Sequence, residues 1–215
     1  LVGTFRQPAF VSAELKSLVT LPDIQWKNGY AEIAKAALIS GSEDWDWLSE
    51  RARQLASQAQ PETEYLELVQ EALVRAVGLK ARLVSADPLE SGVRIFLNYG
   101  HSFAHALETV SNHSIDHGLA VAEGIRFASR LAVEAIGADP DFADRQGAIL
   151  DALGLEAMQI SFTADELFAA MLGDKKNDSR GLRMVFASAP GEMEVKRIDP
   201  DLLKIYLLYW EEAHS

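Results

Sequence analysis

The chain has 215 residues, of which 48% are apolar and 24% charged, and its formal net charge is −12. This composition is that of an ordinary soluble globular protein and fits one domain, with roughly 70% of the unfolded surface buried. The negative charge repels phosphate backbones and anionic lipid, so neither nucleic acid nor a membrane is an expected partner. There is no cysteine, no long apolar run and no signal-peptide pattern, which together predict a cytoplasmic protein.

Hydrophobic periodicity, capping residues and helix breakers predict helices along most of the chain. Pro22 follows the first of them, Gly41 ends the second, and Pro61 opens the fourth. The segment 118–136 is apolar on nearly all sides, so we expect it to be central and buried. The predicted helices span 12–19, 24–40, 42–58, 61–78 with one or two further turns, 93–111, 118–136, 141–153, 163–172 and a final stretch after residue 200.

Only one place in the sequence predicts β-structure. The segments LRMVFAS and EMEVKRI alternate in polarity, and Ala-Pro-Gly separates them, as in a β-hairpin. The predicted fold class is therefore mainly α, a multi-helix domain with one small β-hairpin near the C-terminus. Residues 1–215 are expected to form this single helical domain.

The histidines are the most informative residues. Four of the five share one 17-residue window: His101, His105, His113 and His117. His101 and His105 stand four apart and would project from one helix face, and His113 and His117 repeat that spacing. Without cysteine, a metal here would be held by imidazole and carboxylate. Because HxxxH pairs also arise by chance, the glycines beside His101 and His117 matter, and together these features favour a metal or acid/base site.

Glu32 lies among small and apolar residues in GYAEIAK, three residues before Lys35. One interpretation is an ordinary ion pair on a solvated helix face, worth roughly a few tenths of a kcal/mol. The pair alone favours that interpretation. The other is that Glu32 supplies the anionic third ligand that two histidines need to form a catalytic metal site with an open position.

A second polar group precedes the histidines in KARLVSADPLESGVRIFLNYGH. Arg94 and Asn98 are four apart, and His101 and His105 continue the same stripe on the predicted helix. A face with Arg, Asn and His is neither a typical core face nor a typical solvated face, so it predicts the lining of a polar pocket. Later in the chain, GDKKNDSRG reads by itself as a solvated basic turn.

These motifs resemble the C-terminal helical domain of the 3-dehydroquinate synthases, within the wider family of sugar-phosphate cyclases. The resemblance covers nearly the whole chain. It rests on LVGTFRQPAF with LVTLP, then NGYAEIAK, KARLVSADPLESGVRIFLNYGHSFAHALE, HGLAVAEG and DKKNDSRG, in this order. The chain departs from the family pattern at Ala104 and Leu119, commonly Gly and Glu.

The resemblance implies a role for each polar residue. The metal ligands would be Glu32, His101 and His117, which excludes His105 as a ligand. His105 would be an acid/base group, with Glu90 and Lys35 also catalytic. The substrate's phosphate and carboxylate would be bound by Lys35, Lys80, Arg94, Asn98, His105 and Lys175 or Lys176. NAD would touch Thr20 and Asn28 from this side.

The activity that the resemblance implies is the shikimate-pathway conversion of 3-deoxy-D-arabino-heptulosonate 7-phosphate to 3-dehydroquinate and phosphate. It would need zinc, or another divalent metal such as cobalt, together with NAD. The opening at Leu1 reads as mid-domain, so we expect the N-terminal NAD-binding domain to be missing from this chain and the chain alone to be inactive. That domain, an anionic sugar phosphate and a second copy in a homodimer are the expected partners.

Two other functions stay open from the sequence. The first is another sugar-phosphate cyclase, or half of a metal-dependent polyol dehydrogenase, although an uncharged polyol does not require Lys80 and Arg94. The second is a non-catalytic helical interaction module, although such a module has no need to retain three metal ligands.

Overall fold

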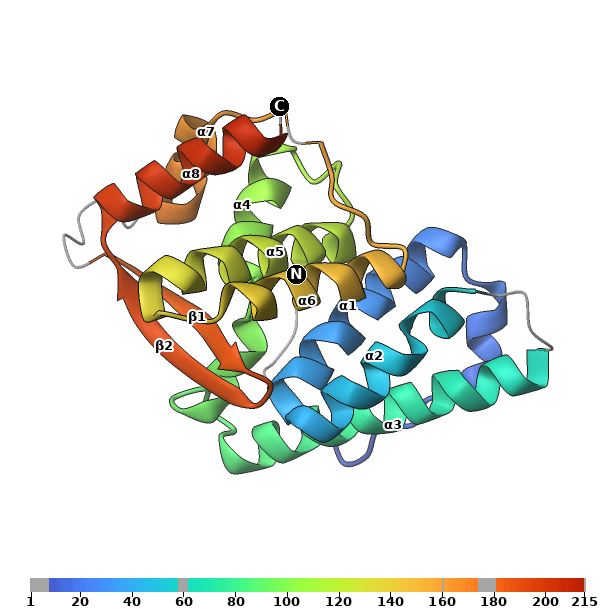
Figure 1. Cartoon of the computed structure of the whole chain (residues 1–215). Helices are drawn as coiled ribbons and strands as arrows, with labels where there is room; N and C mark the ends of the chain where they lie inside the picture. The colour runs from blue at the N-terminus through green and yellow to red at the C-terminus, as the bar shows by residue number, and fades with distance from the viewer. Residues whose placement is uncertain (1–7, 58–61, 160, 174–180, 215) are drawn as a thin grey trace.

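The computed structural model describes residues 8–57, 62–159, 161–173 and 181–214. Within these ranges the domain is mainly helical with one hairpin, which confirms the predicted fold class (Figure 1). The elements are η1 (Leu15–Thr20), α1 (Asp23–Ser40), α2 (Ser42–Ala56), α3 (Glu62–Ala86), η2 (Val93–Asn98), α4 (His101–Val110), α5 (His117–Ile136), α6 (Pro140–Ala152), α7 (Ala164–Leu172), β1 (Leu182–Ala189), β2 (Glu192–Ile198) and α8 (Pro200–His214), where η denotes a 3-10 helix.

Helix α5 is the centre of the fold, as its apolar sequence predicts. It packs against α1, α4, α6 and β1 (Figure 1). Phe127 of α5 stacks on Phe103 of α4 with ring centroids 4.2 Å apart, and Trp210 of α8 meets Phe127 edge-on at 5.4 Å. These contacts fix the position of α4 against α5, and the first residue of each of these helices is a histidine.

Local signals place most helix ends where the sequence predicts them. Helix α1 stops at Gly41, whose φ of 124° is unfavourable for other residues. Thr163 caps α7 through a capping box with Glu166. The hairpin pairs Val185 with Val195, and the Gly191 N–H donates to Leu38 O at 2.8 Å, which ties the hairpin turn to the end of α1.

Two predicted helices differ from the structure. The segment expected as a helix from residue 12 is the shorter 3-10 helix η1, and Glu14, not Ser12, caps it. The continuous helix predicted for 93–111 is wrong, because the chain forms η2, breaks at Tyr99 and Gly100, and begins α4 at His101. Gly100 has φ 79°, and a Cβ there would lie 2.9 Å from the backbone nitrogen of Ile125, so close packing on α5 imposes the break.

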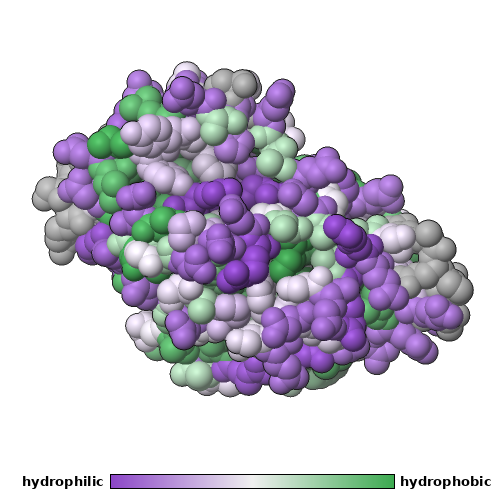
Figure 2. All heavy atoms as spheres, viewed as in Figure 1, coloured by the Kyte–Doolittle hydropathy of each residue, from purple (hydrophilic) through white to green (hydrophobic). Residues whose placement is uncertain are grey.

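The surface is largely polar, as the net charge implies. Figure 2 shows hydrophilic side chains over much of one face, with apolar patches over α8, where Ile205 and Leu208 are exposed. None of the described helices is both long and apolar enough to cross a membrane.

Glu123 is a buried acid in α5, and it makes stability depend on pH. Its side chain is 0% exposed, and its carboxylate accepts the Met158 N–H at 2.8 Å. Burial raises the pKa to about 6, against the opposing effects of that hydrogen bond and of Arg126. Since the folded-state pKa lies above the unfolded one, the contribution of Glu123 to stability is greatest below about pH 4.5 and is lost as the pH rises through 6.

We therefore expect Glu123→Gln to remove this part of the pH dependence. Between pH 4.5 and 7, the free energy of unfolding of the variant should gain about 2 kcal/mol relative to wild type, since one pKa unit corresponds to about 1.4 kcal/mol. Urea unfolding at several pH values measures this difference. Parallel profiles for the two proteins would show that burial does not perturb Glu123.

Candidate metal and substrate site

Three side chains from three helices converge on one point. Glu32 comes from the middle of α1, His101 opens α4, and His117 opens α5. The Nε2 atoms of His101 and His117 lie 3.8 and 3.6 Å from Glu32 Oε1. One ligand atom from each residue lies within 4.8 Å of the others. The structure thus brings together the three residues predicted as metal ligands.

The orientation of both imidazoles suits metal binding. His101 Nδ1 lies 3.2 Å from Tyr99 O, and His117 Nδ1 lies 2.9 Å from Glu108 Oε1. Because each Nδ1 faces an acceptor, it carries the proton, and the lone pair of each ring is on Nε2, toward Glu32. Two imidazole nitrogens, one carboxylate and an open fourth position form the donor set of a catalytic zinc site.

Lys35 shows that the pair with Glu32 is not an ordinary surface ion pair. Its side chain is only 5% exposed, and its Nζ lies 2.7 Å from Glu32 Oε2 and 3.5 Å from His101 Nε2. Burial lowers the pKa of Lys35, and the pairing with Glu32 opposes that shift. The ammonium group is therefore held against the ligand cluster.

The same environment sets the charge of the ligands. Burial, followed by the charge of Lys35, lowers the pKa of His101 to about 4, so this imidazole is neutral at pH 7. For Glu32, burial acts to raise the pKa, but Lys35 and the two histidines together bring it below its usual value. An ionised carboxylate beside a neutral imidazole is the state in which both bind a metal.

Close packing at glycine positions makes this convergence possible. A Cβ on Gly118 would overlap Asn28 Cα, and the Gly118 N–H donates to Asn28 Oδ1 at 2.9 Å. A Cβ on Gly124 would overlap the carbonyl oxygen of Gly100. The first contact holds the start of α5 against α1, and the second holds the start of α4 against α5.

A cleft of about 570 Å³ adjoins the ligand cluster. Its polar lining includes Lys35, Lys80, Arg94 and Asn98, in addition to Glu32, His101 and His117. Glu90 and apolar side chains of α1, α3 and η2 also line it. Although the predicted helix face is broken at Gly100, Arg94 and Asn98 still line the same cleft as His101. The cleft can therefore bind an anionic molecule next to a metal.

Glu90 contacts two of the other polar residues that line this cleft. It lies in the turn after α3 with φ 56°, and its Oε1 accepts the Asn98 Nδ2–H at 2.8 Å. Its Oε2 lies 3.8 Å from Arg94 Nε. Arg94 also donates to Pro88 O at 2.9 Å. The turn thus places an acid, a cation and an amide together; the catalytic role expected for Glu90 and the substrate-binding roles expected for Arg94 and Asn98 stay predictions.

Comparison with known proteins identifies the family. The profile described as 3-dehydroquinate synthase C-terminal matches residues 29–177, more than half of the chain. The chain belongs to this family. The matched region contains Glu32, Glu90, His101 and His117.

Relatives named 3-dehydroquinate synthase are longer than this member. The protein from Shouchella clausii is 34% identical over 205 residues, which is 94% of this chain and 55% of that protein. The protein from Corynebacterium efficiens is 39% identical and matches 94% of this chain and 54% of that protein. The chain therefore spans about half the length of the curated relatives it matches.

Solved structures share the fold of this family member. A 2-deoxy-scyllo-inosose synthase complexed with carbaglucose-6-phosphate, NAD+ and Co2+ superposes with a TM-score of 0.82 at 23% identity, over 97% of this chain and 58% of that one. The 2-epi-5-epi-valiolone synthase from Streptomyces hygroscopicus, with NAD+ and Zn2+ bound, superposes with a TM-score of 0.77 at 24% identity. The superposition covers 93% of this chain and 55% of that one.

Several residues predicted for the site lie at its edge or beyond it. His105 is exposed and meets His101 edge-on with ring centroids 5.4 Å apart, but it does not line the cleft. Thr20 ends η1, where its hydroxyl donates to Ser17 O at 3.3 Å, and its contact with NAD stays a prediction. Lys175 and Lys176 lie outside the described residues.

Two site features were not expected from the sequence. Glu108 accepts a hydrogen bond from His117, and Asn28 accepts one from the Gly118 N–H. The contact of Asn28 with NAD stays a prediction. Glu108 does have a signal in the sequence. It follows His101 by seven residues and His105 by three, which places all three on one face of α4.

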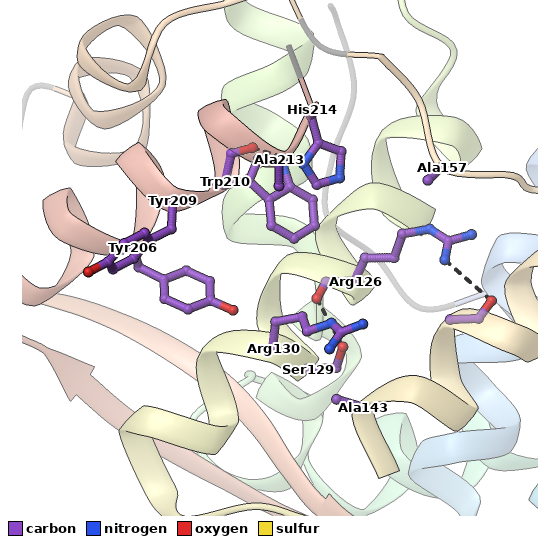
Figure 3. Close-up of a pocket in the computed structure, with 11 residues that line it drawn as sticks. Arg126, Ser129, Arg130, Ala143, Ala157, Tyr206, Tyr209, Trp210, Ala213 and His214 are labelled. Atoms are coloured by element: carbon purple, nitrogen blue, oxygen red, sulfur yellow. Dashed lines mark hydrogen bonds between the residues drawn. The ribbon is translucent and has the colours of Figure 1, made fainter. Parts of the chain in front are cut away.

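A second hollow, of about 430 Å³, lies between α5, α6 and α8 (Figure 3). Its two arginines are already paired, Arg126 with Asp151 and Arg130 with Asp144, each at 2.7 Å. None of the residues predicted for catalysis, substrate or metal lines it. We therefore assign the chemistry to the cleft beside Glu32, which combines potential metal ligands with cations.

Proposed function

We propose that this chain is the metal- and substrate-binding half of a 3-dehydroquinate synthase, a phosphate-eliminating lyase of the shikimate pathway. The substrate would be 3-deoxy-D-arabino-heptulosonate 7-phosphate, and the products 3-dehydroquinate and phosphate. The observation that carries the proposal is the cleft in which Lys80 and Arg94 adjoin the cluster of Glu32, His101 and His117. Neither cations alone nor a ligand cluster alone would favour this activity.

The residues of the cleft have two proposed roles, substrate binding and metal binding. Lys35, Lys80 and Arg94 replace water around the substrate's phosphate and carboxylate with charge-assisted hydrogen bonds. Glu32, His101 and His117 would hold zinc or another divalent ion such as cobalt, which when bound polarises a substrate hydroxyl or carbonyl oxygen.

Proton transfer is proposed for two residues at the rim. Glu90 lies beside Arg94 and Asn98, where it can exchange a proton with a substrate that these residues bind. His105 is exposed beside His101, and an imidazole there is the proposed second acid/base group. In the turn around Glu90, the same contacts that orient the acid also orient the substrate-binding cation.

NAD is proposed to be bound mostly by an N-terminal domain of the parent protein, with Thr20 and Asn28 touching it from this half. The relatives' greater length and the NAD+ in the two solved cyclases support this division. The isolated chain should then bind metal without releasing phosphate from the substrate. Synthase activity from the chain alone would contradict this division. A homodimer and a cytoplasmic location stay predictions.

A chimera tests the function directly. The chain would be joined to the N-terminal part of the Corynebacterium efficiens relative, and phosphate release would be measured with NAD+ and zinc. We expect release from 3-deoxy-D-arabino-heptulosonate 7-phosphate and none from a hexose 6-phosphate. Release from the hexose phosphate would indicate another cyclase, oxidation of an uncharged polyol would indicate a dehydrogenase, and no reaction by a folded, zinc-loaded chimera would favour a non-catalytic module.

Arg94→Ala is expected to weaken substrate binding to the zinc-loaded chain about 10- to 100-fold. A hydrogen bond to a charged group is worth about 1.5–3 kcal/mol, and Arg94 lines the cleft with its side chain 28% exposed. Isothermal titration with the sugar phosphate measures the change. Arg82→Ala is the matched control, because Arg82 is bonded to Ser40 Oγ and does not line the cleft. Equal losses in both variants would mean that only overall charge matters.

A further inference from the structure

Glu108 makes a side-chain contact to one of the proposed metal ligands. Its Oε1 lies 2.9 Å from His117 Nδ1, on the side of the ring opposite to Glu32. The Glu108 side chain is 16% exposed, whereas that of His117 is 47% exposed. The contact therefore joins a largely buried carboxylate to the most exposed of the three ligands.

We propose that Glu108 is a positioning residue for metal binding: its carboxylate fixes the orientation and the tautomer of His117. This inference rests on the proposed metal site. The Nδ1–H of His117 donates to Glu108, so the Nε2 lone pair faces Glu32 Oε1 at 3.6 Å. A carboxylate behind a metal-binding histidine typically raises metal affinity 10- to 100-fold.

His117 needs a side-chain partner to hold its ring, whereas His101 does not. His101 is 15% exposed, and the Tyr99 carbonyl accepts from its Nδ1 within the same turn of chain. Packing and the local backbone thus restrict that ring. His117 is half exposed, so its ring would be free to rotate without a partner. Fixing a freely rotating ring when metal binds would cost conformational entropy. A side chain from the neighbouring helix supplies the restriction.

The position of α5 does not depend on this contact. Asn28 Oδ1 accepts the Gly118 N–H at 2.9 Å, and a Cβ on Gly118 would overlap Asn28 Cα. Ala120 N–H donates to Asp116 O at 3.0 Å, which begins the helical bonding of α5. The start of α5 is therefore fastened to α1 through its backbone, while Glu108 acts on the imidazole of His117. A purely structural role for Glu108 would be redundant with these contacts.

Zinc affinity of the 215-residue chain, measured by competition with a chromophoric chelator, tests the proposal. We expect Glu108→Ala to bind zinc 10- to 100-fold more weakly than wild type. Glu108→Gln keeps an acceptor oxygen but loses the charge, so it should bind several-fold more weakly than wild type and more tightly than the alanine variant. Glu134→Ala removes an exposed carboxylate near the other end of α5 and should bind as wild type does.

The ¹⁵N shifts of His117 in the metal-free chain give a second readout. Wild type should show the Nδ1–H tautomer, and Glu108→Ala should move the proton toward Nε2. A merely structural role would instead lower the metal-free stability and leave the tautomer unchanged.

The outcomes separate this inference from the proposed function. No zinc binding by wild type overturns the metal site and this inference with it. Zinc binding by wild type that is unchanged in both Glu108 variants overturns the inference alone. If the alanine variant does not fold, the glutamine variant decides, and an affinity equal to that of wild type overturns the role of the charge.

Discussion

Alanine in place of Glu32, His101 or His117 is expected to abolish stoichiometric zinc binding by the chain. Each residue supplies one of three donors that lie within 4.8 Å of one another, so two donors remain in each variant. Loss of a direct ligand should cost at least as much as loss of a supporting residue, on the order of 100-fold or more in affinity. Metal analysis of the purified chains should give one zinc for wild type and close to none for each variant.

His105→Ala is the control, because it removes an imidazole from the same helix and leaves the three donors in place. His105 meets His101 edge-on and is exposed, so its removal should retain one zinc per chain. Zinc lost with His105→Ala and retained with Glu32→Ala would overturn the ligand assignment. Absence of zinc from wild type would overturn the metal site of this chain.

The metal cluster shows which ligands can be predicted from residue spacing alone and which cannot. The repeat of four between His101 and His105 predicts a pair on one helix, and the structure places both on α4. Yet the histidine that joins His101 beside Glu32 is His117, which belongs to a different helix. Spacing describes neighbours along one helix, whereas this site depends on how α1, α4 and α5 pack. The ligand set came from the family resemblance and not from periodicity.

The fold was predicted where local signals decide it. Gly41, Thr163 and the Ala-Pro-Gly turn act within a few residues of themselves, and the structure places helix ends and the hairpin there. The break before His101 was missed, because the tight contact of Gly100 with α5 causes it. Glu108 was missed for a related reason, since its partner lies on the next helix.

Gly124→Ala is expected to destabilise the protein more than any other glycine-to-alanine substitution near the site. A Cβ there would overlap the carbonyl oxygen of Gly100 and lie 2.8 Å from its carbonyl carbon. Both atoms belong to the backbone, so no rotamer change relieves the clash, and α4 must move away from α5. We expect a loss of about 3 kcal/mol or more in the free energy of unfolding, at the upper end for overpacking. Chemical denaturation measures it.

The same substitution should also weaken zinc binding, because Gly100 directly precedes His101 and any shift of α4 moves that ligand away from Glu32 and His117. Gly29→Ala is the matched control: Gly29 lies inside α1, three residues from Glu32, and nothing lies within 4 Å of its Cβ position. That variant should be more stable by about 0.5–1 kcal/mol, since alanine favours the helix. A Gly124→Ala chain as stable as wild type, with zinc affinity intact, would mean that the spacing of α4 and α5 is not what assembles the ligands.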